Sequence, residues 1–181
     1  MPNWARNVVE FSHADPAMME RLAKTEGGNL FTEFFPCPKE LTETNAQVGT
    51  SEQEKANFEK YGYSSWYDWQ IANWGTKWDV TPEYIDYGSD NNLKMSFDSA
   101  WSPPLEGYAK FEELGFTVKA YYYEEGMQFA GIYQNGEDES YQNWENSDEA
   151  EEMLPTELDE MFAISENLRM DENDNNDEEE F

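Results

Sequence analysis

Acidic residues are concentrated in the last quarter of this 181-residue chain, and this uneven charge constrains the fold more than any single motif. Residues 136–181 contain 19 acidic side chains and one basic side chain, Arg169, which gives this segment a net charge of −18. The preceding residues carry most of the aromatic side chains, which can build a core from few positions. We therefore expect one domain over residues 1–135 and an acidic extension over 136–181.

Several classes of protein and site are excluded by the sequence. No apolar run is long enough to span a membrane, and we expect no signal peptide, because no basic segment precedes an apolar one. Cys37 and His13 are the only residues of their types, which excludes a disulfide framework, a cysteine-based zinc site and a histidine-rich metal site. We predict a cytoplasmic protein without a metal or another cofactor.

Strand and helix patterns alternate in the first 135 residues. β-Branched and aromatic residues predict strands over 3–13, 29–35 and 93–101, and a hairpin over 116–133 around Glu125 and Gly126. Start and stop signals predict helices over 15–28, with Asp15 as N-cap and Pro16 next, and over 103–115. A helical insertion is predicted over 51–79, where Ser51 and Glu54 form a capping-box pattern and Gly75 ends the second helix.

This order of elements predicts an α+β fold. Two β-α-β units flank the insertion, as in the ferredoxin-like arrangement, a split β-α-β antiparallel sheet with helices on one face. In the extension, Leu158, Met161, Phe162 and Leu168 lie on roughly one helical face, with Thr156 as a candidate cap. Residues 169–181 have no periodicity and repelling charges, so we expect them to be disordered.

Four motifs occur in order along the chain: MPNW followed by Asn7, WYDWQIANWGTKWD, FDSAWSPP, and YYYEEGMQFAGIY. Together they resemble the YubB / Api92-like ferredoxin-domain proteins of phages and plasmids, from residue 1 to about residue 135. The resemblance implies a ferredoxin-like fold and a phage or plasmid origin, hence the cytoplasm of a bacterial host cell. It implies no activity. Ala5 stands where the family usually has a cysteine, so any role of that cysteine is absent here.

The charge of the extension suggests its partner. A strongly acidic surface attracts basic proteins and repels nucleic acid and anionic membranes. Carboxylates at i, i+3 or i+4 on a helix lie about 5–6 Å apart, which is close to phosphate spacing. We predict a non-enzymatic inhibitor that binds the basic surface of a host restriction, CRISPR, nuclease or repair protein by nucleic-acid mimicry. The predicted partner-binding residues are Asp148, Glu149, Glu151, Glu152, Glu157, Asp159 and Glu160. An acidic tail that only increases solubility remains the simpler alternative.

The tryptophan-rich motif NWGTKWD supports a second hypothesis, a small enzyme or ligand-binding domain. Its cleft would contain Trp74, Lys77, Trp78, Asp79 and Trp101. The structural interpretation is that the tryptophans are core residues and that Lys77 and Asp79 form local polar pairs. We favour the structural interpretation, because tryptophans bury a large apolar area and their N–H groups commonly bond to a neighbouring oxygen.

Overall fold

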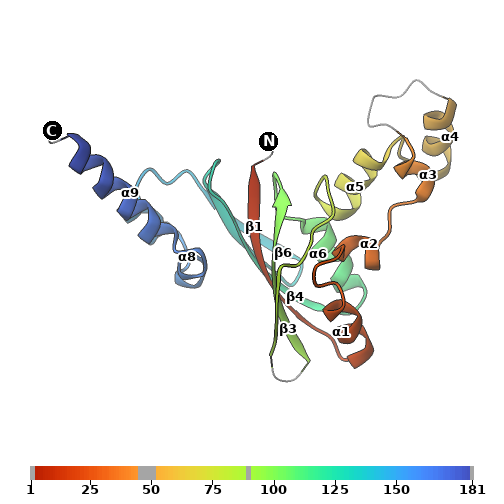
Figure 1. Ribbon diagram of the computed structural model, residues 1–181, viewed down its shortest axis with the longest axis horizontal. Coiled ribbons are helices and arrows are strands. Elements are labelled where there is room, and N and C mark those ends of the chain that lie inside the picture. Colours follow the sequence, from red (N-terminus) through yellow and green to blue (C-terminus); the bar gives the residue numbers. More distant parts are fainter. Residues whose placement is uncertain (1–2, 45–51, 89–90, 180–181) are drawn as a thin grey trace.

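An antiparallel sheet forms the centre of the computed structural model, which describes residues 3–44, 52–88 and 91–179 (Figure 1). Over these residues the sheet has six strands in the order β2-β3-β1-β4-β5-β6. The strands are β1 (Trp4–Ser12), β2 (Tyr84–Tyr87), β3 (Asn92–Ala100), β4 (Thr117–Glu124), β5 (Phe129–Gln134) and β6 (Glu137–Gln142). All neighbouring pairs are antiparallel, and the predicted α+β class is confirmed.

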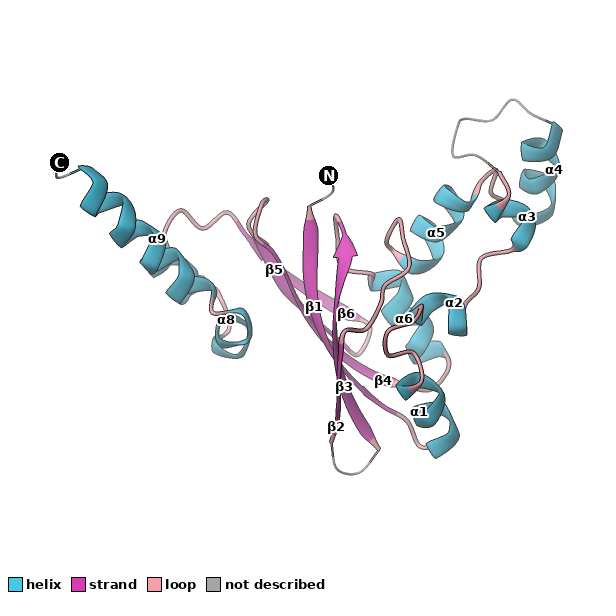
Figure 2. Ribbon diagram, viewed as in Figure 1, coloured by secondary structure: helices cyan, strands magenta, loops and turns pink. Residues whose placement is uncertain are grey.

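One face of the sheet is covered by helices from the first part of the chain (Figure 2). These are α1 (Pro16–Ala23), α2 (Leu30–Phe34), α5 (Trp66–Trp74) and α6 (Leu105–Glu113), with α3 (Lys39–Thr42) and α4 (Glu52–Tyr61) further out. Val9 and Phe11 of β1 lie in one buried core with Leu22 of α1, Trp74 of α5 and Phe111 of α6. The alternation of buried and exposed residues along β1 places this core on one face only.

Asn7 is a buried polar residue that connects β1 to its neighbours. Its Nδ2 donates to the carbonyl oxygen of Ala5 (2.8 Å) and to Oγ of Ser99 (2.9 Å). Its Oδ1 accepts from the hydroxyl of Tyr108, on α6, at 2.8 Å. Because a buried amide costs free energy unless it is hydrogen-bonded, this network favours one alignment of β1, β3 and α6.

The other face of the sheet carries three C-terminal helices: α7 (Ser147–Met153), α8 (Thr156–Phe162) and α9 (Ile164–Glu179). Tyr121 and Tyr123 of β4 form a second core with Leu158 and Phe162 of α8 and Ile164 of α9. The sheet therefore lies between an N-terminal and a C-terminal group of helices, which Figure 1 shows on opposite sides of it.

The strand predicted over 29–35 is wrong, because helix α2 occupies this segment. Its large apolar residues, Leu30, Phe31, Phe34 and Phe35, recur at a spacing of four, which suits a helix better than a strand. Other local predictions are confirmed. Asp15 caps α1 by accepting from the N–H of Ala17 at 2.9 Å, and α5 ends at Gly75 in the left-handed conformation (φ 77°).

The second strand of the sheet lies after the helical insertion rather than before it. β2 pairs with β3 through Tyr84 and Ser96, so α2 to α5 all belong to the connection from β1 to β2. β2 was not predicted, because it spans only Tyr84–Tyr87 and lies among polar residues and turn residues. The predicted capping box falls partly outside the described residues, which exclude Ser51.

The C-terminal segment also contains more regular structure than the sequence predicts. Strand β6 lies within residues 136–142, where acidic side chains obscure the strand pattern, and it pairs with β5. Residues 169–179, predicted to be disordered, continue helix α9. Because extending a helix costs far less than starting one, contacts at the beginning of α9 stabilise its later turns.

Candidate functional site

The acidic extension is attached to the sheet by apolar residues. Trp144, Leu158 and Phe162 are buried together with Tyr121 and Tyr123 of the sheet. The acidic residues occupy most other positions of α7 and α8, as expected for amphipathic helices. The carboxylates of this segment therefore project from helices that are fixed to the body of the protein.

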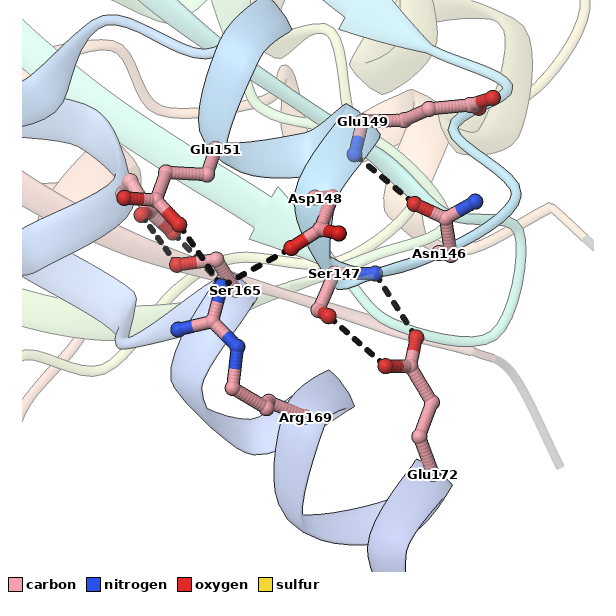
Figure 3. A network of polar contacts seen from close by, with 9 residues as sticks. Asn146, Ser147, Asp148, Glu149, Glu151, Ser165, Arg169 and Glu172 are labelled. Carbon is pink, nitrogen blue, oxygen red and sulfur yellow. Dashed lines mark hydrogen bonds and ion pairs between the residues drawn. The ribbon is translucent and has the colours of Figure 1, made fainter.

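Helix α7 begins with a set of capping interactions that also involve α9 (Figure 3). Oδ1 of Asn146 accepts from the N–H of Glu149, and Oε2 of Glu149 accepts from the N–H of Glu145, both at 2.9 Å. The N–H and hydroxyl of Ser147 both donate to the carboxylate of Glu172, at 2.8 and 2.7 Å. These two bonds lower the pKa of Glu172. The carboxylate thus ties α9 to the first turn of α7.

Arg169, the only basic residue of 136–181, forms a second link between α9 and α7 (Figure 3). Its Nη2 lies 2.7 Å from Oε2 of Glu151 and 3.4 Å from Oδ1 of Asp148. The pKa of Arg169 is raised, first by the bond to Glu151. The side chain of Asp148 is still 91% exposed, so it remains accessible to a partner.

Two further carboxylates make internal bonds around α8. Oε2 of Glu157 accepts from Nζ of Lys119 (3.0 Å) and from the hydroxyl of Tyr121 (2.9 Å), and these bonds lower the pKa of Glu157. The carboxylate of Asp159 accepts from the N–H (2.7 Å) and the hydroxyl of Ser165. Glu157 thus connects α8 to the sheet, and Asp159 stabilises the first turn of α9.

The predicted partner-binding residues therefore divide into two groups. Five of them, Asp148, Glu149, Glu151, Glu157 and Asp159, make hydrogen bonds or ion pairs inside the protein. Glu152 and Glu160 are exposed, and no hydrogen bond or ion pair connects them to the part of the chain that the structure describes. Of the seven, Glu152 and Glu160 therefore have both carboxylate oxygens available to an external partner.

Two residues of the alternative ligand cleft support the fold. Trp74 is 1% exposed, stacks on Phe31 with a ring separation of 5.7 Å, and donates its indole N–H to the carbonyl oxygen of Phe35 at 3.0 Å. The carboxylate of Asp79 accepts from the backbone N–H groups of Phe31 (2.8 Å) and Thr32 (2.7 Å). Asp79 therefore caps the N-terminus of α2, where backbone donors would otherwise lack partners.

The other three residues of this alternative cleft lie near the surface. Nζ of Lys77 lies 4.5 Å from the ring centre of Trp78, a cation–π contact, and forms no pair with Asp79 in the described structure. Trp78 is 39% exposed and Trp101 is 55% exposed, so the prediction that these two tryptophans are core residues is wrong. A tryptophan just beyond the end of a strand need not point into the core.

Sequence reasoning missed several residues beside these tryptophans. Trp4 is 48% exposed, and its ring centre lies 5.9 Å from that of Trp78. Arg6 lies on the same face of β1 and directly opposite Asp98 of β3. The sequence signal that could have identified these residues is the period of two along β1. This period places Trp4 and Arg6 on the face opposite to Ala5 and the core.

The described ranges contain neither a candidate metal site nor a candidate membrane span. Within them, no group of histidine, cysteine, aspartate and glutamate side chains is arranged to hold a metal ion. No helix in the same ranges has the length and apolar character needed to cross a bilayer.

Comparisons with known proteins find similarity at the level of structure. No protein-family model matches the sequence, and no curated protein matches it. Among solved structures, the chain matches the crystal structure of a protein api92 from Yersinia pseudotuberculosis, of the DUF1281 family, with 10% sequence identity and a TM-score of 0.42. The match covers 80% of this chain and 99% of that chain. The matched protein is an Api92 protein, as are the proteins that the sequence motifs resemble.

Proposed function

We propose that this protein binds a basic protein surface through the carboxylates of α7 to α9 and thereby inhibits a nucleic-acid-handling or defence protein of a bacterial host. The observation that supports the proposal is the net charge of −18 over residues 136–181, on helices that an apolar core fixes to the sheet. A surface that is already ordered loses less conformational entropy on binding than a disordered tail does.

The proposed mechanism is mimicry of nucleic acid. Exposed carboxylates on α7 and α8 replace phosphates in the basic groove of the partner, with Glu152, Glu160 and the exposed Asp148 making the direct contacts. Glu149, Glu157 and Asp159 contribute chiefly by keeping the helices in place, because their oxygens already accept bonds within the protein. The phage or plasmid origin implied by the sequence motifs is consistent with a host protein as the target.

We also infer a ferredoxin-like core built from β1, α1, β2, β3, α6 and β4. The strand order β2-β3-β1-β4, with antiparallel neighbours and with α1 and α6 on one face, supports this inference. The connection from β1 to β2 is then enlarged by α2 to α5, and β5 and β6 extend the sheet beyond β4. Backbone NOE contacts in NMR spectra that place β1 elsewhere than between β3 and β4 would contradict it.

The test is affinity capture of host proteins, followed by binding measurements on the captured partner. We expect basic nucleic-acid-binding proteins, release by duplex DNA, and affinity that falls steeply with added salt, because exposed charges are screened beyond about 8 Å at physiological ionic strength. The double variant Glu152→Gln/Glu160→Gln should weaken binding without a change in thermal stability.

The matched control removes the same number of charges from the body. Glu59→Gln/Glu113→Gln alters exposed residues of α4 and α6 and should leave the affinity nearly unchanged. Binding that is insensitive to salt, or that DNA does not displace, contradicts mimicry. An equal loss of affinity in both double variants would mean that only total charge matters, which contradicts a binding role for α7 and α8.

A further inference from the structure

Three exposed tryptophans lie near one end of the sheet. Trp4 begins β1 and pairs in register with Ala100, the last residue of β3. The N–H of Trp101 donates to the carbonyl oxygen of Asn3 at 2.9 Å, and the ring of Trp78 lies against that of Trp4. We call Trp4, Trp78 and Trp101 the tryptophan patch. Their exposures of 48%, 39% and 55% mark it as a surface that folding leaves open.

The backbone of Trp101 adopts an unfavourable conformation. Its φ of 73° lies in the left-handed region, which a bulky residue rarely adopts. Glycine or asparagine would fit this position with less strain, and the side chain of Trp101 is 55% exposed and belongs to neither of the two described cores. Strain in an exposed aromatic residue indicates a role in recognition rather than in packing.

Two carboxylates that form no ion pair in the described structure, those of Asp98 and Glu83, lie near the patch. Asp98 is directly opposite Arg6, yet the guanidinium of Arg6 lies over the rings of Tyr123 (5.3 Å) and Phe162 (5.9 Å). Within the described ranges, neither Asp98 nor Glu83 forms an ion pair. Burial, and then the charge of Glu83, raise the pKa of Asp98, whereas the charge of Arg6 lowers it.

The net charge limits what this surface can bind. Phosphate-bearing ligands and a second copy of this chain are both repelled by a protein of formal charge −29. A cationic polypeptide is attracted. Among cationic side chains, the planar guanidinium of arginine both stacks on indole rings and forms two parallel bonds to a carboxylate. Lys77 already lies on Trp78, which leaves Trp4 and Trp101 as the accessible rings.

We propose that the tryptophan patch, with Asp98 and Glu83, binds an arginine side chain of the partner protein. The guanidinium lies against Trp4 or Trp101 and its N–H groups donate to the carboxylate of Asp98. This inference rests on the proposed function, because it names the residue that the basic partner inserts, but it places the contact on the sheet rather than on α7 to α9. Aromatic residues surrounded by polar groups are typical anchors of protein interfaces.

The first experiment is titration of the full-length protein with a blocked Gly-Arg-Gly-Arg-Gly peptide, followed through the indole N–H signals of its seven tryptophans by NMR. Signals of Trp4, Trp78 and Trp101 should move and saturate, whereas those of buried Trp74 and Trp144 should not. The lysine analogue should bind at least about threefold more weakly, since it cannot stack and pair at once. Absence of saturable shifts at the patch, or equal binding of both peptides, overturns the proposal.

The second experiment uses variants. Trp101→Gly should reduce affinity for the arginine peptide by about tenfold or more, and it should not lower the unfolding temperature, because the strained backbone is relieved. Asp98→Asn should weaken binding and abolish the preference over the lysine peptide. The control Phe58→Ala removes an exposed ring on α4, away from the patch, and should bind normally. Normal binding by Trp101→Gly together with a lower unfolding temperature would show a structural role instead.

The two proposals fail separately. If Glu152→Gln/Glu160→Gln binds the arginine peptide normally but no DNA-displaceable partner is found, the tryptophan patch stands and the proposed mimicry does not. If the captured partner binds Trp101→Gly and Asp98→Asn as tightly as the unaltered protein, the patch is not its contact, whatever the outcome for α7 and α8.

Discussion

Gly131 on β5 lies directly under the phenol ring of Tyr122 on β4, whose hydroxyl crosses β5 to donate to Oδ1 of Asp138 on β6 at 2.9 Å. A Cβ atom at position 131 would lie 2.2 Å from that hydroxyl oxygen. One glycine therefore allows a single tyrosine to connect three neighbouring strands.

Gly131→Ala should destabilise the protein by about 1–3 kcal/mol, as expected for a side chain forced into a packed position. Denaturant unfolding monitored by tyrosine and tryptophan fluorescence measures this difference. Gly28→Ala is the control, because its Cβ would approach Thr25 only to 3.4 Å and its backbone needs no left-handed conformation. Equal effects of the two substitutions would contradict the role given to Gly131.

Trp74→Ala should lower the free energy of unfolding by about 3–5 kcal/mol, because it removes a fully buried aromatic side chain and leaves the carbonyl oxygen of Phe35 without its donor. Trp78→Ala should cost clearly less, since 39% of that side chain is already exposed. Thermal and denaturant unfolding of both variants gives the comparison. A larger loss of unfolding free energy for Trp78→Ala would contradict the conclusion that Trp74 is the tryptophan of this motif that stabilises the fold.

The carboxyl group of Asp138 should make stability depend on pH. Burial raises its pKa, although the bond from Tyr122 opposes the shift. An acid whose pKa is higher in the folded state binds its proton more tightly there, so its contribution to stability is lost as the pH rises from the unfolded pKa through the folded pKa. Asp138→Asn should therefore gain stability relative to the unaltered protein near neutral pH and lose this gain in acid. A gain that is independent of pH would refute the assignment.

Glu172→Ala should loosen helix α9 without unfolding the sheet, because it removes both bonds to Ser147. Hydrogen–deuterium exchange should become faster in α9 and in the first turn of α7, and remain slow in β1 and β4. Glu166→Ala, on the same helix, is the matched control, since Glu166 is exposed and makes no described bond. Unchanged exchange in α9 would mean that its apolar contacts alone hold it.

Features specified by neighbouring residues were predictable from the sequence. Asp15 caps the helix that starts beside it, and Gly75 ends the helix that precedes it. The cap of α2 was not predictable, because the carboxylate that accepts its backbone N–H groups, Asp79, lies almost fifty residues further along the chain. Because the sequence does not reveal the bonds from Asp79, the aromatic residues of 29–35 predicted a strand.

The candidate site, too, could be predicted from the sequence only in part. The acidic character of residues 136–181 is evident from composition, but which carboxylates are free is decided by Arg169, Lys119 and Ser165, whose positions depend on the fold. The exposure of Trp101 likewise follows from a backbone conformation that aromatic composition does not reveal.

Strand β6 is the last in the sheet, and its outer edge pairs with no strand of the described structure. An open edge of this kind is where sheets from separate molecules join and begin to aggregate. Glu137, Asp138 and Glu139 place three acidic residues in succession along it. A second β6 approaching this edge would bring like charges together, so the acidic composition that defines the C-terminal segment also keeps separate molecules from joining edge to edge at high concentration.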